Sequence, residues 1–242
     1  MRAFPIAAAL VAASPAFAAG PDASTVAVQA VTPTGDGRAA VATCAGVLIA
    51  PDIVLTAGHC LDRVARPAQT AVFAYRAGKA APPPIAVLRI ARHPDHAPFW
   101  RETAGDPATR QREVAADMAL VKLATPITAQ PPARVGAAPG DGTGAGVGRE
   151  GPGAAARSGG LKRFRVSGAR LSTGGSAGVG FATLDRPACT GDSGGPLADA
   201  SGAVWGLIAA VLKPSGGCGT RVTATPVDPA SEGFRRMRAA LD

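Results

Sequence analysis

The chain has 242 residues, of which 47% are hydrophobic, so it can bury a core and form one or two domains. Its formal net charge is +8, but aromatic residues make up only 4% of the sequence, and no segment interleaves them with the scattered arginines. This pattern indicates a solvated basic surface and argues against a nucleic-acid interface, so we expect no nucleic-acid partner.

Residues 1–19 have the composition of a signal peptide. Arg2 supplies a positive start, residues 6–13 are apolar, and Ala16-Phe17-Ala18 forms a cleavage site of the small-x-small type. The apolar stretch is too short to span a membrane, and we expect no membrane span elsewhere. We therefore expect export, to a secreted or periplasmic location. The alternative, an apolar N-terminal strand, is disfavoured because alanine dominates the segment.

The remaining chain alternates short apolar runs with turns rich in glycine and proline, which is typical of all-β proteins. A first set of candidate strands spans residues 26–31, 45–49, 53–56, 71–75, 85–91 and 118–123. After a proline-rich connection, a second set spans residues 161–166, 178–183, 196–198, 204–211 and 220–225. Between the connection and the second set, residues 140–160 have the composition of a flexible loop.

The C-terminal segment from Asp228 to Leu241 predicts a helix. Asp228 can cap its N-terminus, Pro229 suits the first helical position, and the arginines lie toward the C-terminal end. Phe234, Met237 and Leu241 fall on one face, which we expect to pack on the body of the protein.

Three polar residues stand out against this pattern. His59 follows two apolar runs that flank a Pro51-Asp52 turn, and Asp117 directly precedes an apolar run. Ser193 lies in residues 189–196, Cys-Thr-Gly-Asp-Ser-Gly-Gly-Pro. A serine hydroxyl is a poor nucleophile, so a catalytic serine needs an exposed tight turn with backbone N–H donors beside it. The glycines permit such a turn, although the run also fits a glycine-rich surface loop.

Chain order narrows the class of serine enzyme. The run fits the Gly-x-Ser-x-Gly elbow of α/β-hydrolases, but those enzymes place their histidine after the serine. Here all three histidines, His59, His93 and His96, precede Ser193. A subtilisin-like order needs an acid before His59, and no acid there has a suggestive setting. The remaining order is histidine, aspartate, serine.

The segments around His59, Asp117 and Ser193 resemble the motifs of the trypsin-like (chymotrypsin-fold) serine proteases of the secreted bacterial type, over roughly residues 26–240. The resemblance implies that Ser193 is the nucleophile, that His59 is the general base and that Asp117 orients His59. The backbone N–H groups of Gly191 and Ser193 would form the oxyanion hole. The implied fold is two six-stranded antiparallel β-barrels, residues 20–125 and 126–227, with the active site between them and a C-terminal helix over residues 228–242. Within the loop-like residues 140–160, Gly144-Ala145-Gly146-Val147-Gly148 resembles a family strand.

Four cysteines allow three disulfide pairings, and the resemblance selects Cys44 with Cys60 and Cys189 with Cys218. The cysteines lack the spacing of zinc sites. Residues 93–96, His-Pro-Asp-His, could offer metal ligands, but the proline favours a loop, so we expect no metal and no cofactor. The expected partner is a protein or peptide substrate, and we expect a monomer.

The primary specificity pocket departs from the family pattern. Cleavage after Lys or Arg needs an acid two positions before Cys189, where this chain has Pro187, followed by Ala188. The pocket wall aligns as Ala209, Ala210 and Val211, where the family typically has Ser-Trp-Gly. Because Val211 should narrow the pocket, we expect a small apolar residue on the amino side of the scissile bond, the P1 position.

Two further departures concern buried acids. Ala209 replaces a serine that commonly donates to the catalytic aspartate, so Asp117 must find another donor or a water. The chain also lacks the Ile-Val-Gly-Gly-like N-terminus whose ammonium pairs with the aspartate before the nucleophile. Another cation or other hydrogen bonds must therefore hold Asp192, since a buried unpaired charge is costly. In that case maturation needs only removal of the signal peptide.

The interval from His93 to Asp117 is longer than a tight turn requires, and Phe99 and Trp100 within it either anchor the loop or form subsite walls. Three functions remain: an active secreted endopeptidase, a catalytically weak or inactive relative that acts as a binding protein, and an esterase-like hydrolase. The complete triad favours an enzyme, because a binding protein has no need of all three residues. The departures described above keep the second alternative open.

Overall fold

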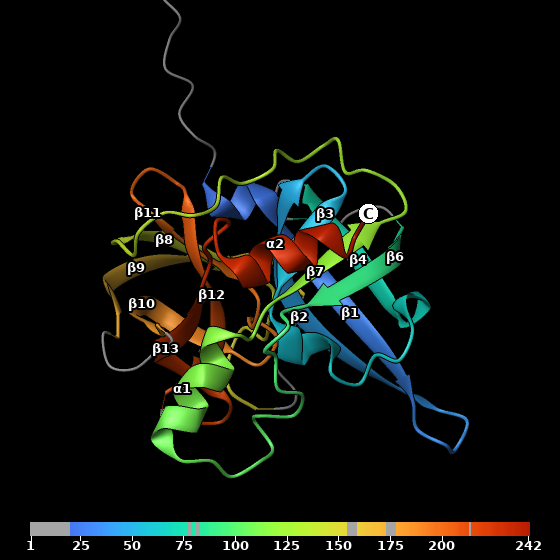
Figure 1. Cartoon of the computed structure of the whole chain (residues 1–242), viewed down its shortest axis with the longest axis horizontal. Coiled ribbons are helices and arrows are strands. Elements are labelled where there is room, and N and C mark those ends of the chain that lie inside the picture. Colours follow the sequence, from blue (N-terminus) through green and yellow to red (C-terminus); the bar gives the residue numbers. More distant parts are fainter. Residues whose placement is uncertain (1–19, 77–78, 81–82, 154–158, 173–177, 213) are drawn as a thin grey trace, which may run out of the picture.

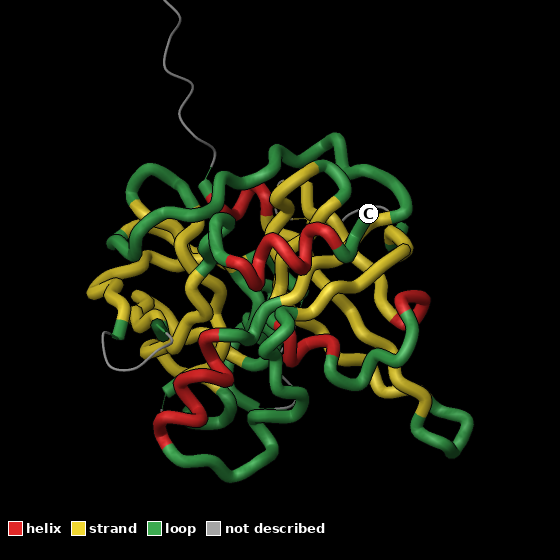
Figure 2. The backbone as a smooth tube through the Cα atoms, viewed as in Figure 1, coloured by secondary structure: helices red, strands yellow, loops and turns green. Residues whose placement is uncertain are grey.

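The structure is a computed structural model that describes residues 20–76, 79–80, 83–153, 159–172, 178–212 and 214–242. The expected signal peptide lies outside the described residues. Strands make up most of the regular secondary structure of the described chain and gather into two groups side by side (Figures 1 and 2). No described helix is both long enough and apolar enough to cross a membrane.

The first group forms a closed antiparallel barrel. Its strands follow the order β1-β2-β3-β7-β6-β4, and β1 pairs with β4 to close the ring. The short β5 pairs antiparallel with the end of β4. The bounds are β1 Thr25–Pro33, β2 Ala39–Ala50, β3 Ile53–Thr56, β4 Thr70–Arg76, β5 Lys79–Ala80, β6 Ile85–Arg92 and β7 Ala119–Leu123.

The second group is also a closed antiparallel barrel, in the order β10-β13-β12-β11-β8-β9. The bounds are β8 Gly142–Gly146, β9 Lys162–Leu171, β10 Gly180–Cys189, β11 Pro196–Asp199, β12 Val204–Val211 and β13 Cys218–Pro226. The prediction of two six-stranded antiparallel barrels is therefore confirmed. β8 overlaps residues 144–148, which resemble a family strand, and begins two residues earlier, because glycines at positions 142 and 144 allow close approach to β11.

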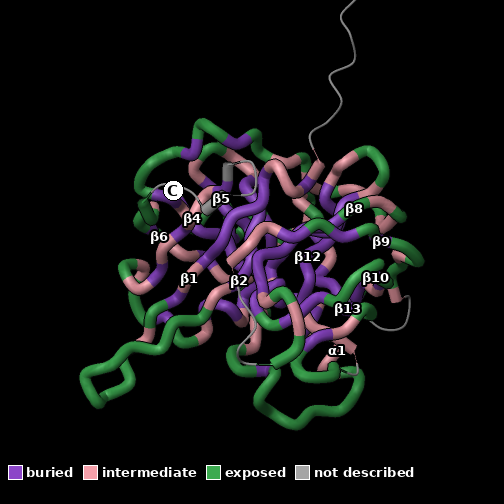
Figure 3. The backbone as a smooth tube through the Cα atoms, turned by 180° about the vertical axis from the view of Figure 1, so that it is seen from behind, coloured by how far each residue is buried: buried purple, intermediate pink, exposed green. Residues whose placement is uncertain are grey.

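Strand alternation explains how the two barrels join. In β2 and β3, Leu48 and Val54 point into the core of the first barrel, while their neighbours Val47 and Leu55 point to a core shared with the second barrel. Because β2 and β3 carry apolar residues on both faces, one face packs in the core of the first barrel and the other packs in the shared core. Figure 3 shows the resulting buried centre, whereas exposed residues lie in loops, at the outer end of the β1–β2 hairpin and at alternating positions of outer strands such as β9 and β10.

The C-terminal helix α2 spans Glu232–Ala239, which is shorter than the sequence predicted. Its N-cap is Ser231, whose Oγ accepts from the Phe234 N–H at 3.3 Å. Asp228 instead accepts from the Ala230 N–H at 2.8 Å in the preceding turn, so Pro229 is not in the helix. Phe234 and Met237 pack in the shared core, and α2 lies across the two barrels (Figure 1).

A second helix, α1 (Pro107–Ala115), was not predicted. Asp106 caps it by accepting from Ala108 N–H at 2.9 Å and Thr109 N–H at 3.0 Å, with Pro107 in the first turn. The capping signal was present in the sequence, but the helix is short and lies within the long interval before Asp117. It packs near β13, where Thr225 Oγ1 donates to the Val114 carbonyl at 2.8 Å.

Candidate active site

Strand pairing in the first barrel brings His59 next to Asp117. His59 lies in the short 3-10 helix Gly58–Leu61 that follows β3, and Asp117 lies two residues before β7. Because β3 and β7 are antiparallel neighbours, with Thr56 opposite Ala119, the end of one meets the start of the other. The two residues are 58 positions apart in sequence and in direct contact in space.

Asp117 is fully buried and accepts two hydrogen bonds from His59. Its Oδ1 accepts the backbone N–H at 2.8 Å, and its Oδ2 lies 2.7 Å from Nδ1. Burial alone would raise the pKa of Asp117, but the charge of His59, the two hydrogen bonds and the charge of His96 outweigh burial and lower it below its usual value. An ionised Asp117 assigns the proton to Nδ1 of His59, which leaves the Nε2 lone pair facing the cleft.

Ser193 reaches the same place from the second barrel, in the turn between β10 and β11. The Ala45 N–H of β2 donates to the Ser193 carbonyl at 2.8 Å, which fixes this turn against the first barrel. Gly194 has a φ of +79°, and a Cβ there would collide with the Ala45 carbonyl oxygen. The glycine after the serine is therefore required by the contact between the barrels.

The turn also presents two unused backbone donors. Gly191 has a φ of +97°, a conformation that favours glycine. In the described part of the chain, no acceptor takes the N–H of Gly191 or of Ser193, whereas Asp192 N–H donates to the Cys189 carbonyl at 3.0 Å. Two free N–H groups beside a serine form the arrangement that binds an oxyanion.

Asp192 is held by Lys162, a residue that the sequence did not single out. Lys162 lies on β9 with a side chain that is 5% exposed, and its Nζ forms an ion pair with Asp192 Oδ2. Asp192 also accepts from Gly148 N–H and Cys189 N–H, each at 2.7 Å. Burial raises the pKa of Asp192, and Lys162 and these backbone donors oppose the rise. The sequence did contain a sign that Lys162 is buried. In the alternating pattern of this strand, Lys162 falls on the same face as the buried residues at positions 164 and 166.

His96 is a second residue missed by sequence reasoning. It is 1% exposed, its Nε2 lies 2.7 Å from Asp62 Oδ1, and its Nδ1 lies 3.8 Å from Asp117 Oδ1. Gly58 leaves room for the ring, since a Cβ there would lie 2.7 Å from Nδ1. His96 therefore lies behind the triad. Ala209, which stands where the family commonly has a serine that donates to the catalytic aspartate, is buried in the same apolar cluster as Trp100.

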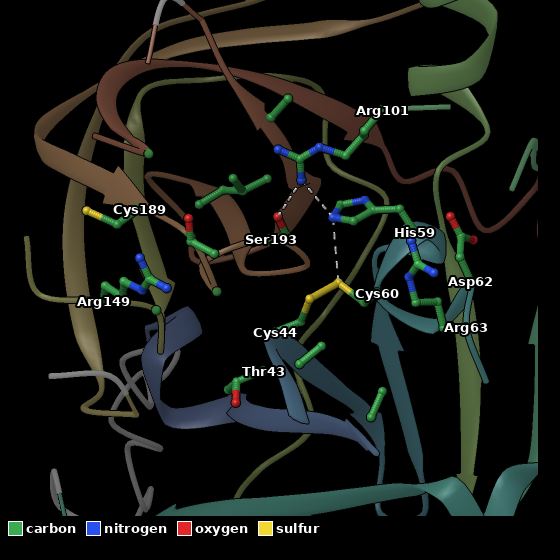
Figure 4. Close-up of a pocket in the computed structure, with 18 of the residues that line it drawn as sticks. Thr43, Cys44, His59, Cys60, Asp62, Arg63, Arg101, Arg149, Cys189 and Ser193 are labelled. Atoms are coloured by element: carbon green, nitrogen blue, oxygen red, sulfur yellow. Dashed lines mark hydrogen bonds between the residues drawn. A yellow bond between two sulfur atoms is a disulfide. The ribbon is translucent and has the colours of Figure 1, made fainter. Parts of the chain in front are cut away.

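The arginine of the long loop occupies the cleft. Arg101 Nη1 lies 3.0 Å from His59 Nε2 and 3.4 Å from Ser193 Oγ, and Figure 4 shows the guanidinium between the two residues. The guanidinium, rather than the serine hydroxyl, is thus the donor that faces Nε2. Trp100 beside it is buried, with its ring edge-on to His59 at 6.1 Å, so it anchors the loop. Phe99 is 39% exposed and forms part of the cleft wall.

The cleft has a volume of about 590 Å³ and runs from the β1–β2 hairpin past Ser193 to the end of β12. Ala210 and Val211 line it, as the alignment of the pocket wall implied. Three other expected pocket residues do not: Pro187 is exposed, and Ala188 and Ala209 are buried behind the surface. The register of β10 against β13 shifts between Thr183 and Ala188, and sequence alignment alone does not show which side chains then face the cleft. Ile208, Pro214 and Gly217 contribute to the lining instead.

The structure joins Cys44 to Cys60 and Cys189 to Cys218. The first bond ties β2 to the helix that bears His59, and the second ties the start of the serine turn to β13. Among the described residues, ligand atoms of Cys44, Cys60 and His59 lie within 4.8 Å of one another, but both sulfurs belong to the disulfide and are not thiolates.

Comparison with known proteins agrees with this geometry. A family model described as trypsin matches residues 22–232. Among solved structures, a protease from M. tuberculosis in its active form is 18% identical with a TM-score of 0.51, over 99% of this chain and 94% of that one. HL collagenase is 17% identical with a TM-score of 0.63, over 92% and 97% of the two chains. An inactivated protease paralogue of the scabies mite is 20% identical with a TM-score of 0.54, over 90% and 93%.

At these identities the solved structures show a shared fold and do not transfer an activity. None of the curated proteins compared with the chain matches it. The family model, by contrast, spans most of the sequence and includes all three residues of the His59, Asp117 and Ser193 cluster. The chain therefore belongs to the trypsin family.

Proposed function

We propose that this protein is a secreted serine endopeptidase that uses His59, Asp117 and Ser193. The observation that supports this most strongly is the hydrogen bond of 2.7 Å between a fully buried Asp117 and Nδ1 of His59. This bond holds the imidazole in the tautomer that a general base requires, with the Nε2 lone pair facing the cleft. Secretion is supported by the composition of residues 1–19 and by two disulfides.

The proposed reaction follows from this arrangement. Once Nε2 is free of Arg101, it accepts the proton of the Ser193 hydroxyl as Oγ attacks the substrate carbonyl carbon. The N–H groups of Gly191 and Ser193 stabilise the negative oxygen that forms. The protonated His59 then donates its proton to the leaving amine, which leaves an acyl-enzyme. Water, activated by the same histidine, hydrolyses the ester and regenerates Ser193.

A preference for a small apolar P1 residue is supported by Val211. This residue lines the cleft, and its Cγ1 lies so close to Gly219 that a Cβ on that glycine would collide with it. Val211 thus fills space beside the serine turn that a glycine would leave open. No described acid lines this end of the cleft to receive a Lys or Arg side chain.

Activity without internal cleavage is supported by Lys162. Its ammonium supplies the positive charge that Asp192 needs, and both side chains lie within the second barrel. The turn that bears Gly191 and Ser193 is therefore held by a cation from the folded chain itself. On this proposal, removal of residues 1–19 is the only maturation step.

An inactive binding protein is the second candidate, and the contact of Arg101 with both His59 and Ser193 favours it. A fluorophosphonate probe separates the two candidates. We expect it to label the wild-type protein and not Ser193→Ala. Digestion of casein, compared with turnover of a short ester, then distinguishes an endopeptidase from an esterase. Absence of probe labelling in a folded Arg101→Gln variant, in which no guanidinium contacts Nε2, would contradict the proposed function.

A further inference from the structure

The guanidinium of Arg101 lies at the reacting atoms without an anionic partner. Its hydrogen-bonding partners, His59 Nε2 and Ser193 Oγ, carry no negative charge, and it also lies over the ring of Trp100 at 5.8 Å. No carboxylate oxygen of the described residues lies within ion-pair distance of Arg101. A cation held only by neutral partners at the mouth of a cleft can gain a stronger, charge-assisted hydrogen bond from an incoming anion.

The loop that bears Arg101 is fastened on both sides of it. Asp62 Oδ2 accepts from the Phe99 N–H at 2.6 Å, while Asp62 Oδ1 contacts His96. Arg63 forms a two-pronged ion pair with Glu102, at 2.8 and 3.1 Å. Phe99 itself has a φ of +60°, a strained conformation that these contacts maintain. The backbone at Arg101 is therefore fixed, and release of His59 requires only rotation of the side chain.

The same contacts explain why Arg101 has no carboxylate partner among the described residues. The two nearest acids that line the cleft, Asp62 and Glu102, are already engaged by His96 and Arg63. Arg149 lines the opposite wall, where it donates to the Gly153 carbonyl at 3.3 Å and has no described carboxylate partner. The reacting part of the cleft is therefore positively charged overall.

We propose that Arg101 is a specificity-determining residue that selects substrates with Asp or Glu adjacent to the P1 residue. This inference rests on the proposed function. A substrate carboxylate draws the guanidinium away from Nε2, and His59 is then free to accept the Ser193 proton. A peptide with a neutral side chain at that position must displace Arg101 without compensation, and one with Lys must do so against charge repulsion. One side chain thus both blocks His59 when no substrate is bound and selects substrates with an acidic residue beside P1.

The test uses one peptide sequence with a small apolar P1 residue and with Asp, Asn or Lys at the positions directly before and directly after P1. We expect wild-type kcat/KM to be roughly tenfold higher for Asp than for Asn at one of these positions, with Lys lowest. Arg101→Gln should abolish that difference and raise turnover of the Asn and Lys peptides. Arg112→Gln, which removes an exposed arginine of α1 away from the cleft, should behave like the wild type.

Salt provides an additional measurement, because screening by 0.5 M NaCl should reduce the wild-type preference and leave Arg101→Gln unchanged. The inference is overturned if the wild type cleaves all three peptides equally or if Arg101→Gln keeps the preference for Asp. Labelling of Ser193 by the fluorophosphonate probe in Arg101→Gln, where no guanidinium contacts His59, distinguishes failure of this inference from failure of the proposed function. A labelled, active enzyme without acidic preference refutes only the role of Arg101, whereas a folded Arg101→Gln variant that is not labelled refutes the proposed function as well.

Discussion

Replacing Lys162 with methionine tests whether a cation inside the second barrel holds the serine turn. The substitution keeps an unbranched side chain that is one atom shorter, and it removes the ammonium from Asp192, which is 0% exposed. The carboxylate would retain the N–H groups of Gly148 and Cys189 and lose its only described cation. Removing one partner of a buried ion pair costs about 3–5 kcal/mol in the free energy of unfolding.

The neighbouring arginine supplies a matched control. Arg163→Met removes the same charge from the same strand, but Arg163 is 76% exposed and pairs with Asp22 at the surface. An exposed ion pair contributes about 0.2–1 kcal/mol. Urea unfolding of the two variants at pH 8 therefore separates a buried from a surface charge. Equal unfolding free energies for both variants would refute the assigned role of Lys162.

The effect of pH has a definite sign. Burial raises the pKa of Asp192, and loss of Lys162 removes the main opposing contribution. A carboxyl with a raised folded-state pKa contributes stability below its unfolded value and loses that contribution as pH rises through the folded value. Lys162→Met should therefore lose less stability, relative to the wild type, at pH 5 than at pH 8. The double variant with Asp192→Asn should recover stability at pH 8, because no buried charge remains.

Three further substitutions test the triad, His96 and the pocket. Asp117→Asn should lower kcat about 10⁴-fold, because the amide favours the wrong histidine tautomer, and steady-state kinetics on a peptide would measure it. Since the pKa of Asp117 is lowered, its stabilising contribution is present above pH about 4 and lost as pH falls through the folded value, so acid unfolding of Asp117→Asn should be less steep. His96→Phe should lower kcat more than it changes KM, as expected for a positioning residue of Asp117; an unchanged kcat would contradict this role. Val211→Gly should shift cleavage toward larger P1 residues at a cost of about 1 kcal/mol in stability, whereas an unaltered cleavage profile would exclude Val211 as the pocket wall.

The positions of the barrel strands could be predicted well because they depend on local pattern. Residues 53–56 and 204–211 are strands with the bounds that alternation predicted, and the other predicted strands differ from the observed ones mainly at their ends. The ends depend on pairing partners. β1 and β2, for example, continue to Pro33 and Ala39 because each supplies the other's backbone hydrogen bonds in an exposed hairpin. The helix α1 escaped prediction because its capping signal was read as part of a long loop.

The sequence by itself determined the catalytic candidates, since His59, Asp117 and Ser193 stand in motifs whose order is specific, and Ser193 lies between glycines that a tight turn requires. It also determined that Asp192 needed a partner, because a buried charge cannot remain uncompensated. Only the tertiary structure decided which partner it is. Lys162 is 30 residues away, and its contact with Asp192 depends on the closure of the second barrel. The positions of His96 behind Asp117 and of Arg101 over His59 were likewise set by packing between distant segments, which local sequence pattern does not encode.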